Sequence, residues 1–251
     1  MSGGALGPPD APEIVLELSG DLDMAAVDGA ETRLRAALAS QPGRLVVDLS
    51  AVTFLDSSGI RLLLRADELA RGRGVPLSIV RPPDGVWRLL ERFRLDTRLP
   101  FMPATVSAAA ATAPAGPDRD DDAPGLRMEL TADPQAPGLA RQGVTGATPE
   151  LPDAVRDVVL LLVSEVVTNA VRHGCEGPDD RVRLTLAYRD GSIRIEVEDP
   201  GDGIPAATTG GDGDDHLRES GWGLLMVDRF ASRWGTELEP SRVWFELDVD
   251  G

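Results

Sequence analysis

In the first hundred residues, short apolar runs alternate with segments in which apolar residues recur at helical spacing. The expected strands are 13–18, 44–49 and 77–80, and the expected helices are 24–39, 57–70 and 86–93. Segment 13–18 alternates polar and apolar side chains, as a half-buried strand does, whereas 44–49 is an apolar run typical of a central strand. Strands that alternate with helices of about 10–15 residues predict an α/β domain.

The second half has a different order of elements. The expected strands are 126–130, 181–188, 192–198, one that ends at 238, and 243–249, and the expected helices are 153–173 and 223–230. The long helix follows Pro152, a residue suited to a helix start. Asp190 and Gly191 separate two alternating runs, as in a tight hairpin. Helices grouped with an antiparallel sheet predict an α/β sandwich, so the fold class is α/β followed by α+β.

A break in composition separates the two halves. Between Pro103 and Gly125 the chain is rich in Ala, Pro and Gly, includes consecutive aspartates and contains one large apolar residue, Val106. Such a segment cannot bury a core, so we interpret it as a flexible linker. The expected organisation is a disordered N-terminus over 1–12, a first domain over 13–102, the linker over 103–125 and a second domain over 126–251.

The composition narrows the range of functions. The chain has 42 acidic and 25 basic residues, all of the latter Arg, and a net charge of -17, of which -12 falls on residues 126–251. This acidity argues against nucleic acid and anionic membranes as partners, because both attract clustered basic residues. A single cysteine excludes a disulfide framework. No apolar run approaches a membrane span of about 18 residues, and the N-terminus does not resemble a secretory signal, so a cytoplasmic protein is expected.

Three segments of the second half carry residue types suited to a nucleotide. In the first, SEVVTNAVRHG over 164–174, Glu165 and Asn169 are four residues apart and therefore share one helical face. A carboxylate and an amide on one rim offer oxygen ligands for a hard cation and a base for a hydroxyl group. The alternative interpretation of this segment alone is a solvated polar helix face.

The other two segments are rich in glycine. In DPGDGIP, Asp199 stands at a strand end and is suited to accept a hydrogen bond from an exocyclic amine, while Gly201 and Gly203 allow the backbone to approach a ligand closely. Taken alone, this segment is equally an ordinary loop. In SGWGLLMV, Gly221 and Gly223 precede a helix whose N-terminal N–H groups suit a phosphate.

Together and in this order, the three segments resemble the N, G1 and G2 boxes of the GHKL ATPase superfamily, or Bergerat fold, over about residues 126–249. The resemblance is closest to anti-sigma-factor serine kinases. It implies ATP and Mg²⁺, with Glu165 as the general base, Asn169 as the magnesium ligand and Asp199 as the contact of the adenine amine. It also implies that the four glycines named above line the nucleotide pocket. Ser241 stands before the last strand, where many relatives carry a threonine.

The first half contains a different motif, DSSG at 56–59, where a loop enters an expected helix. Aspartate and serine are favoured N-cap residues, so capping explains the motif taken alone. Together with the preceding SGDLD and VDLS segments, however, it resembles the STAS domain of anti-sigma-factor antagonists over about residues 13–105. The resemblance implies that the first serine after the aspartate, Ser57, accepts a phosphoryl group. Ser58 is the alternative acceptor.

The two resemblances together predict a partner-switching regulator of a bacterial sigma factor. An ATP-dependent protein serine kinase domain of the anti-sigma type is then fused to its STAS-type substrate domain. The acceptor is expected in the same chain, in another copy or in a separate STAS protein, and a homodimer stays open. A phosphoryl group on Ser57 adds negative charge beside Asp56 and is expected to weaken binding to the acidic second domain.

Two alternatives belong to other functional classes. The second domain is either a non-catalytic module that binds nucleotide or partners, so that the chain sequesters a sigma factor or a STAS protein, or an ATPase without a protein substrate. Transfer of label from ATP to the chain distinguishes both from a kinase.

Overall fold

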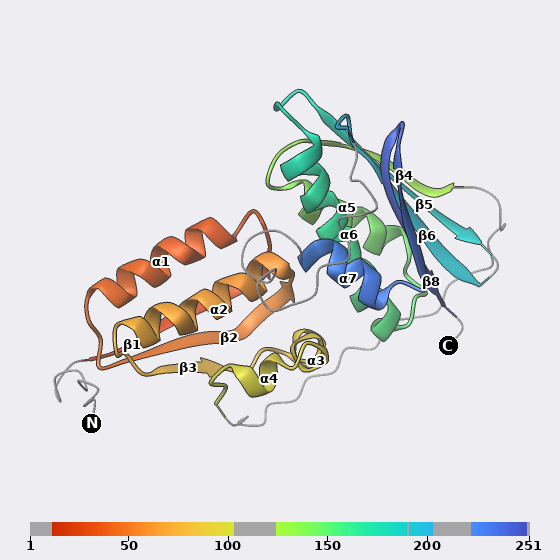
Figure 1. Cartoon of the computed structure of the whole chain (residues 1–251). Helices are drawn as coiled ribbons and strands as arrows, with labels where there is room; N and C mark the ends of the chain where they lie inside the picture. Colours follow the sequence, from red (N-terminus) through yellow and green to blue (C-terminus); the bar gives the residue numbers. More distant parts are fainter. Residues whose placement is uncertain (1–11, 103–123, 190, 203–221, 250–251) are drawn as a thin grey trace. The chain divides into compact units, whose positions relative to one another are not determined.

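The computed structural model describes residues 12–102, 124–189, 191–202 and 222–249 (Figure 1). The chain divides into two compact units, Met1–Ala110 and Ala111–Gly251, each with its own sheet. Two of the expected pocket glycines, Gly203 and Gly221, lie outside the described residues. Among the described helices, none combines the length and the hydropathy that a membrane span requires.

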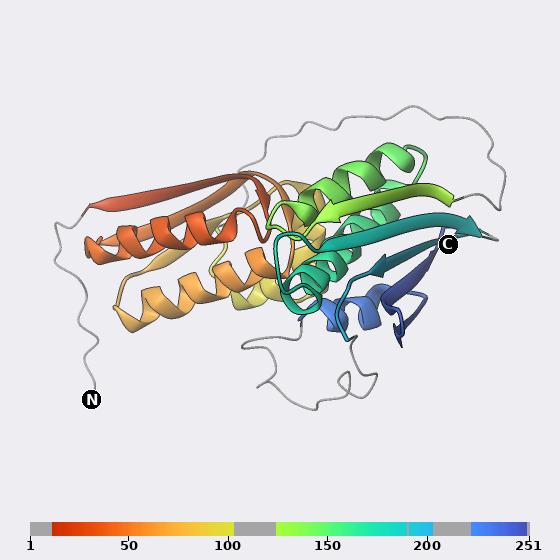
Figure 2. The ribbon, with the colours of Figure 1, turned by 90° about the horizontal axis from the view of Figure 1, so that it is seen from above.

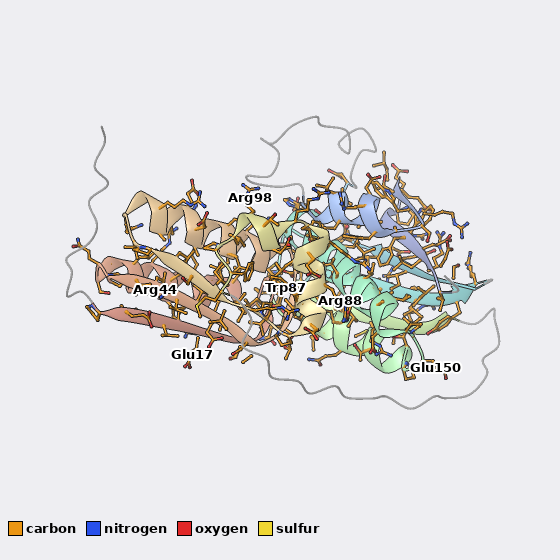
Figure 3. The ribbon with its side chains drawn as sticks, turned by 90° about the horizontal axis from the view of Figure 1, so that it is seen from below. Glu17, Arg44, Trp87, Arg88, Arg98 and Glu150 are labelled. Carbon is orange, nitrogen blue, oxygen red and sulfur yellow. The ribbon has the colours of Figure 1, made fainter. Side chains whose placement is uncertain are left out.

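The N-terminal unit is a three-stranded parallel sheet in the order β1-β2-β3, with helices on both faces (Figures 1 and 3). Its elements are β1 (Glu13–Leu22), α1 (Val27–Ala39), β2 (Arg44–Leu55), α2 (Ser57–Gly72), β3 (Leu77–Val80), α3 (Asp84–Arg92) and α4 (Leu95–Arg98). Helices α1 and α2 lie side by side, and α3 packs on β2. Parallel strands need such crossover helices between them.

Strand β2 is the centre of this unit. Leu45, Val46 and Val47 are all buried although successive side chains of a strand point to opposite faces, so both faces of β2 are covered. Strand β1 lies at the edge, and its Val15 is 51% exposed. Leu34 of α1 is buried with them. The α/β class expected from the sequence is confirmed.

An aromatic contact fastens the end of this unit to its sheet. The ring of Trp87, labelled in Figure 3, meets Phe101 edge to face with 5.0 Å between centroids. The guanidinium of Arg81 lies 4.6 Å from the centroid of the Trp87 ring. Phe101 also forms a parallel bridge with Ile79 of β3. The chain after α4 therefore extends the sheet beyond β3.

The C-terminal unit is a five-stranded antiparallel sheet in the order β4-β5-β6-β8-β7, with its helices on one face (Figures 1 and 2). Its elements are β4 (Pro124–Thr131), α5 (Ala136–Ala147), α6 (Asp153–Asn169), the π-helical turn η1 (Ala170–Gly174), β5 (Arg181–Arg189), β6 (Ser192–Glu198), α7 (Trp222–Phe230), β7 (Arg233–Leu238) and β8 (Ser241–Asp248). This is the α/β sandwich that the sequence predicts.

The two faces of this sheet differ in chemistry. Leu184, Ile195 and Phe245 are fully buried on the helical face. On the other face Arg194 pairs with Glu196 at 2.7 Å and Glu246 at 2.8 Å. Its guanidinium also lies 4.0 Å from the centroid of the Trp244 ring. The alternation along the strands thus produces one core face and one face covered by ion pairs.

Three details depart from the sequence-based expectation. Strand β2 continues past residue 49 to Leu55, and the expected helix over 153–173 ends at Asn169, followed by η1. Helix α5 was not expected at all. It packs on β4, where a Cβ at Gly143 would collide with the Sδ atom of Met128, so the close contact requires glycine.

Candidate functional site

Helix α6 is the platform of the site in the C-terminal unit. It begins after Pro152, whose φ of -51° suits a helix entry, and buries Val159, Leu162 and Val166 in the core. Glu165 lies among these residues and is only 3% exposed, while Asn169 is the last residue of the helix. The two side chains expected to hold a base and a cation are therefore one turn apart on one helix.

The start of α7 lies directly against the Glu165 carboxylate. A Cβ placed at Gly223 would be 3.1 Å from Glu165 Oε2, which is tighter than ordinary van der Waals contact. Helices α6 and α7 are in contact along this region. The glycine expected to open a phosphate-binding helix thus lies beside the expected general base.

Asp199 is fixed by two hydrogen bonds that end on one of its oxygens. The backbone N–H of Gly201 donates to Oδ1 at 2.9 Å, and the Ser241 hydroxyl donates to the same atom at 2.8 Å. Within the described residues, no group donates to Oδ2. A carboxylate held through one oxygen presents the other in a fixed direction, which suits recognition of an amino group.

Two glycines make room for this carboxylate. A Cβ at Gly174 would collide with the Asp199 side chain, and a Cβ at Gly201 would lie 2.8 Å from the Cα of Gly174. Gly174 is the last residue of η1, and π-helical turns occur frequently at functional sites. The turn that interrupts α6 therefore ends where the backbone must approach Asp199 most closely.

Sequence reasoning did not assign a role to Ser241 or Gly174. Ser241 precedes β8, and the pairing of Glu198 with Arg242 brings it opposite Asp199. The hydroxyl residue before the last strand was a usable signal, but only the strand register shows what it meets. Gly174 stands in the first segment, next to His173, with no sequence feature that links it to the aspartate 25 positions later.

The loop after η1 is organised by an acidic side chain. The backbone N–H groups of Glu176 and Gly177 donate to Asp180 at 2.8 and 3.1 Å and hold the pKa of its carboxyl below the usual value. Burial, and then the nearby charges of Asp180 and Asp199, raise the pKa of the Cys175 thiol. Cys175 is thus a protonated neighbour of the site at neutral pH.

A buried arginine lies next to the expected base in the sequence of contacts. Arg141 of α5 is 4% exposed, and its Nη1 donates to the Ser164 hydroxyl at 2.8 Å. Ser164 immediately precedes Glu165. Packing of α5 on α6 therefore brings a fixed positive charge to the residue before the carboxylate.

The expected phosphoacceptor lies at the start of α2 in the N-terminal unit. Asp56 is the N-cap, and its Oδ1 accepts hydrogen bonds from the N–H groups of Ser58 at 2.8 Å and Gly59 at 3.3 Å. The capping interpretation is therefore confirmed. Ser57 and Ser58 occupy the first helical positions and are 3% and 2% exposed.

The residues present fit a nucleotide and a magnesium ion. The described residues contain no cluster of three side chains able to hold a metal by themselves. Mg²⁺ bound with a nucleotide needs only one or two protein oxygens, because phosphates and water supply the rest. Asn169 offers such an oxygen, and the space that Gly174 and Gly201 leave around Asp199 suits a base that carries an amino group.

Comparison with known proteins assigns each unit to a family. Residues 10–103 match the family model of the Mlab, STAS domain, and residues 130–242 match that of the histidine kinase-like ATPase domain. The anti-sigma-F factor antagonist RsfB of Mycobacterium tuberculosis is 33% identical over 95 residues, which are 34% of this chain and 74% of that protein. The anti-sigma F factor of Heyndrickxia coagulans is 30% identical over 117 residues, which are 42% of this chain and 77% of that protein.

A solved structure is also similar to part of this chain. The anti-sigma factor antagonist SpoIIAA in its unphosphorylated form is 22% identical, with a TM-score of 0.33, and the similarity covers 40% of this chain and 87% of that one. The two family models fall on the two structural units described above. The chain therefore belongs to the family of anti-sigma factors and their antagonists, as a fusion of a STAS domain with a histidine kinase-like ATPase domain.

Proposed function

We propose that the chain is a partner-switching regulator of a sigma factor whose ATPase domain binds ATP with Mg²⁺ and phosphorylates a serine of a STAS domain. The acceptor is Ser57, in the same chain or in another copy, or the equivalent serine of a separate STAS protein. The domain pair and the relatives that are an anti-sigma factor and an antagonist support this function over a scaffold without catalysis.

The observation that carries the proposal is the environment of Asp199. Its carboxylate is held by Gly201 and Ser241, and two glycines keep side chains away from it. A structural aspartate in an ordinary loop needs no such clearance. We assign Asp199 to the adenine amino group, with Gly203 and Gly221 as further pocket residues, and Asn169 to the magnesium ion.

Glu165 is the group that handles the proton. A serine hydroxyl must lose its proton as its oxygen forms a bond to phosphorus, and the Glu165 carboxylate accepts that proton. Bound Mg-ATP supplies the phosphoryl group, and ADP leaves with the electrons of the broken bond. Gly223 leaves the face of the carboxylate near Oε2 without a side chain, so a substrate hydroxyl has a route to it.

Phosphorylation then changes the choice of partner. A phosphoryl group adds about -1.5 to -2 charges at neutral pH, beside the capping carboxylate of Asp56. The ATPase half carries a net charge of -12, so this addition weakens its attraction for the STAS domain. The released ATPase domain is then available to a sigma factor.

Transfer of label from [γ-³²P]ATP to the full chain tests this function. We expect label on the wild type in the presence of Mg²⁺, loss of label in Glu165→Gln, and loss of label in Ser57→Ala but not in Ser58→Ala. Mixing the Ser57→Ala chain with the Glu165→Gln chain tests transfer between copies, because only the second chain keeps an acceptor.

Two results contradict the proposal. Steady release of phosphate without labelled protein, also with an added STAS protein, indicates an ATPase with no protein substrate. Label that persists in both Ser57→Ala and Glu165→Gln refutes the assigned acceptor and base.

A further inference from the structure

The first two turns of α2 carry a cation that the proposed function does not use. Arg61 lies three residues after Ser58, and its Nη2 donates to the Ser58 hydroxyl oxygen at 3.2 Å. It lies four residues after Ser57, and residues four apart face the same side of a helix. The guanidinium is therefore held next to both serines of the motif.

The surroundings of these serines are otherwise acidic. Asp56 caps the helix through the N–H groups of Ser58 and Gly59. The end of β1 approaches the same point, because a Cβ at Gly59 would be only 2.7 Å from the carbonyl oxygen of Leu22. Asp21 and Asp23 flank Leu22 in the sequence. A phosphoryl group added here enters a region that already holds several carboxylates.

The next arginine along the helix is already engaged elsewhere. Arg65 Nε donates to Glu31 Oε1 of α1 at 2.9 Å, and Glu31 also pairs with Arg35. These hydrogen bonds, that from Arg35 foremost, lower the pKa of Glu31 and keep the pair charged. Arg65 thus ties α2 to α1, whereas Arg61 points to the serines.

We propose that Arg61 binds the phosphoryl group once it is on Ser57 and so holds the modified helix start in place. This inference rests on the proposed phosphorylation of Ser57. A guanidinium presents a planar fork of donors that matches a phosphate better than a single ammonium does. Its charge offsets the repulsion from Asp56, so the domain tolerates the modification without loss of the helix cap.

The test measures the second pKa of phosphoserine by ³¹P NMR in the full chain, with phosphoserine incorporated at position 57 during translation. A nearby cation favours the dianion, so we expect this pKa to be about half a unit higher in Arg61→Gln than in the chain with Arg61. Arg61→Lys should give an intermediate value. Arg65→Gln is the matched control and should leave the pKa unchanged, because Arg65 is bound to Glu31.

The same second pKa in the Arg61 and Arg61→Gln chains overturns the inference, as does an equal rise in Arg65→Gln. If Arg61→Gln does not fold by circular dichroism, Arg61→Lys carries the comparison. Phosphoserine is installed without the ATPase domain, so the outcome is independent of kinase activity. A chain that shows the pKa difference but never labels itself refutes the proposed function and keeps this inference, and the reverse pattern does the opposite.

Discussion

At the scale of single residues, the chemistry of the site depends on what surrounds Asp199. Ser241 reaches it from 42 positions away in the sequence, and Gly174 allows the approach by having no side chain. The sequence predicts the aspartate and the glycine after it, because both stand in one short segment. It does not predict their partners, because these are brought in by strand register and by the end of η1.

Replacement of Ser241 by Ala should weaken nucleotide binding. The variant removes a hydrogen bond to a charged group, which contributes about 1.5–3 kcal/mol, so the affinity for ATP should fall roughly tenfold or more. Ser192→Ala is the matched control, because Ser192 is equally buried in the same sheet but donates to the carbonyl of Arg189. Equal affinities of the Ser241→Ala chain and the wild type, measured by titration with a fluorescent ATP analogue, contradict the assignment.

Replacement of Gly174 by Ala should have a larger effect on binding than on folding. The new methyl group collides with the Asp199 carboxylate and displaces it from the position in which Ser241 holds it. Gly177→Ala, three residues later, is the control because no atom lies within 4 Å of its Cβ position. The measurements are ATP affinity and the thermal unfolding midpoint. Unchanged affinity in Gly174→Ala would show that the position of Asp199 is unimportant.

At the scale of elements, long periodic segments were predictable and short or glycine-rich ones were not. Helix α6 and the β5–β6 hairpin follow from apolar periodicity and turn chemistry. Helix α5 escaped prediction because it contains Pro137, Gly143 and Gly146, which have low helix propensity. Its stability comes from packing, since Gly143 lies against Met128 of β4 and Val144 is buried.

The start of α2 is fixed against β1 by a similar close contact. Gly59→Ala should destabilise the N-terminal unit by about 1–3 kcal/mol, because its Cβ would meet the carbonyl of Leu22 and the side chain of Leu55. Gly72→Ala at the other end of α2 meets nothing within 4 Å and should be neutral or slightly stabilising. Urea unfolding followed by circular dichroism compares the two, and equal free energies of unfolding would refute the packing argument.

At the scale of the whole molecule, the division into two different domains was predictable from composition and from two separate sets of motifs. The arrangement of charge was only partly so. The excess acidity of the second half can be counted from the sequence, but the ion pairs across its sheet depend on which strands are neighbours. Glu246 is an example, since its partners Arg194 and Arg233 come from β6 and β7 on either side of β8.

This ion-pair face makes the stability of the ATPase domain sensitive to acid. Burial alone would raise the pKa of Glu246, but the hydrogen bonds from Arg194 and Arg233 outweigh it, and the folded-state pKa lies below the ordinary value of 4.5. The resulting stabilisation is present above the unfolded-state pKa and is lost as the pH falls through the folded-state pKa.

Glu246→Gln should therefore be less stable than the wild type near neutral pH, and the difference should shrink as the pH falls below about 4.5. Urea unfolding followed by tryptophan fluorescence over a series of pH values measures it. A difference that stays constant from neutral to acidic pH would show that the ion pairs of Glu246 do not contribute through its charge.

The central claim is that the pocket around Asp199 binds an adenine nucleotide, and calorimetric titration of ATP with Mg²⁺ into the full chain tests it most directly. The account predicts binding of one ATP per chain, a large loss of affinity in Asp199→Asn, and little binding of GTP, which has no amino group at the corresponding ring position. Absence of heat with ATP, or equal binding of ATP by the wild type and Asp199→Asn, would contradict it.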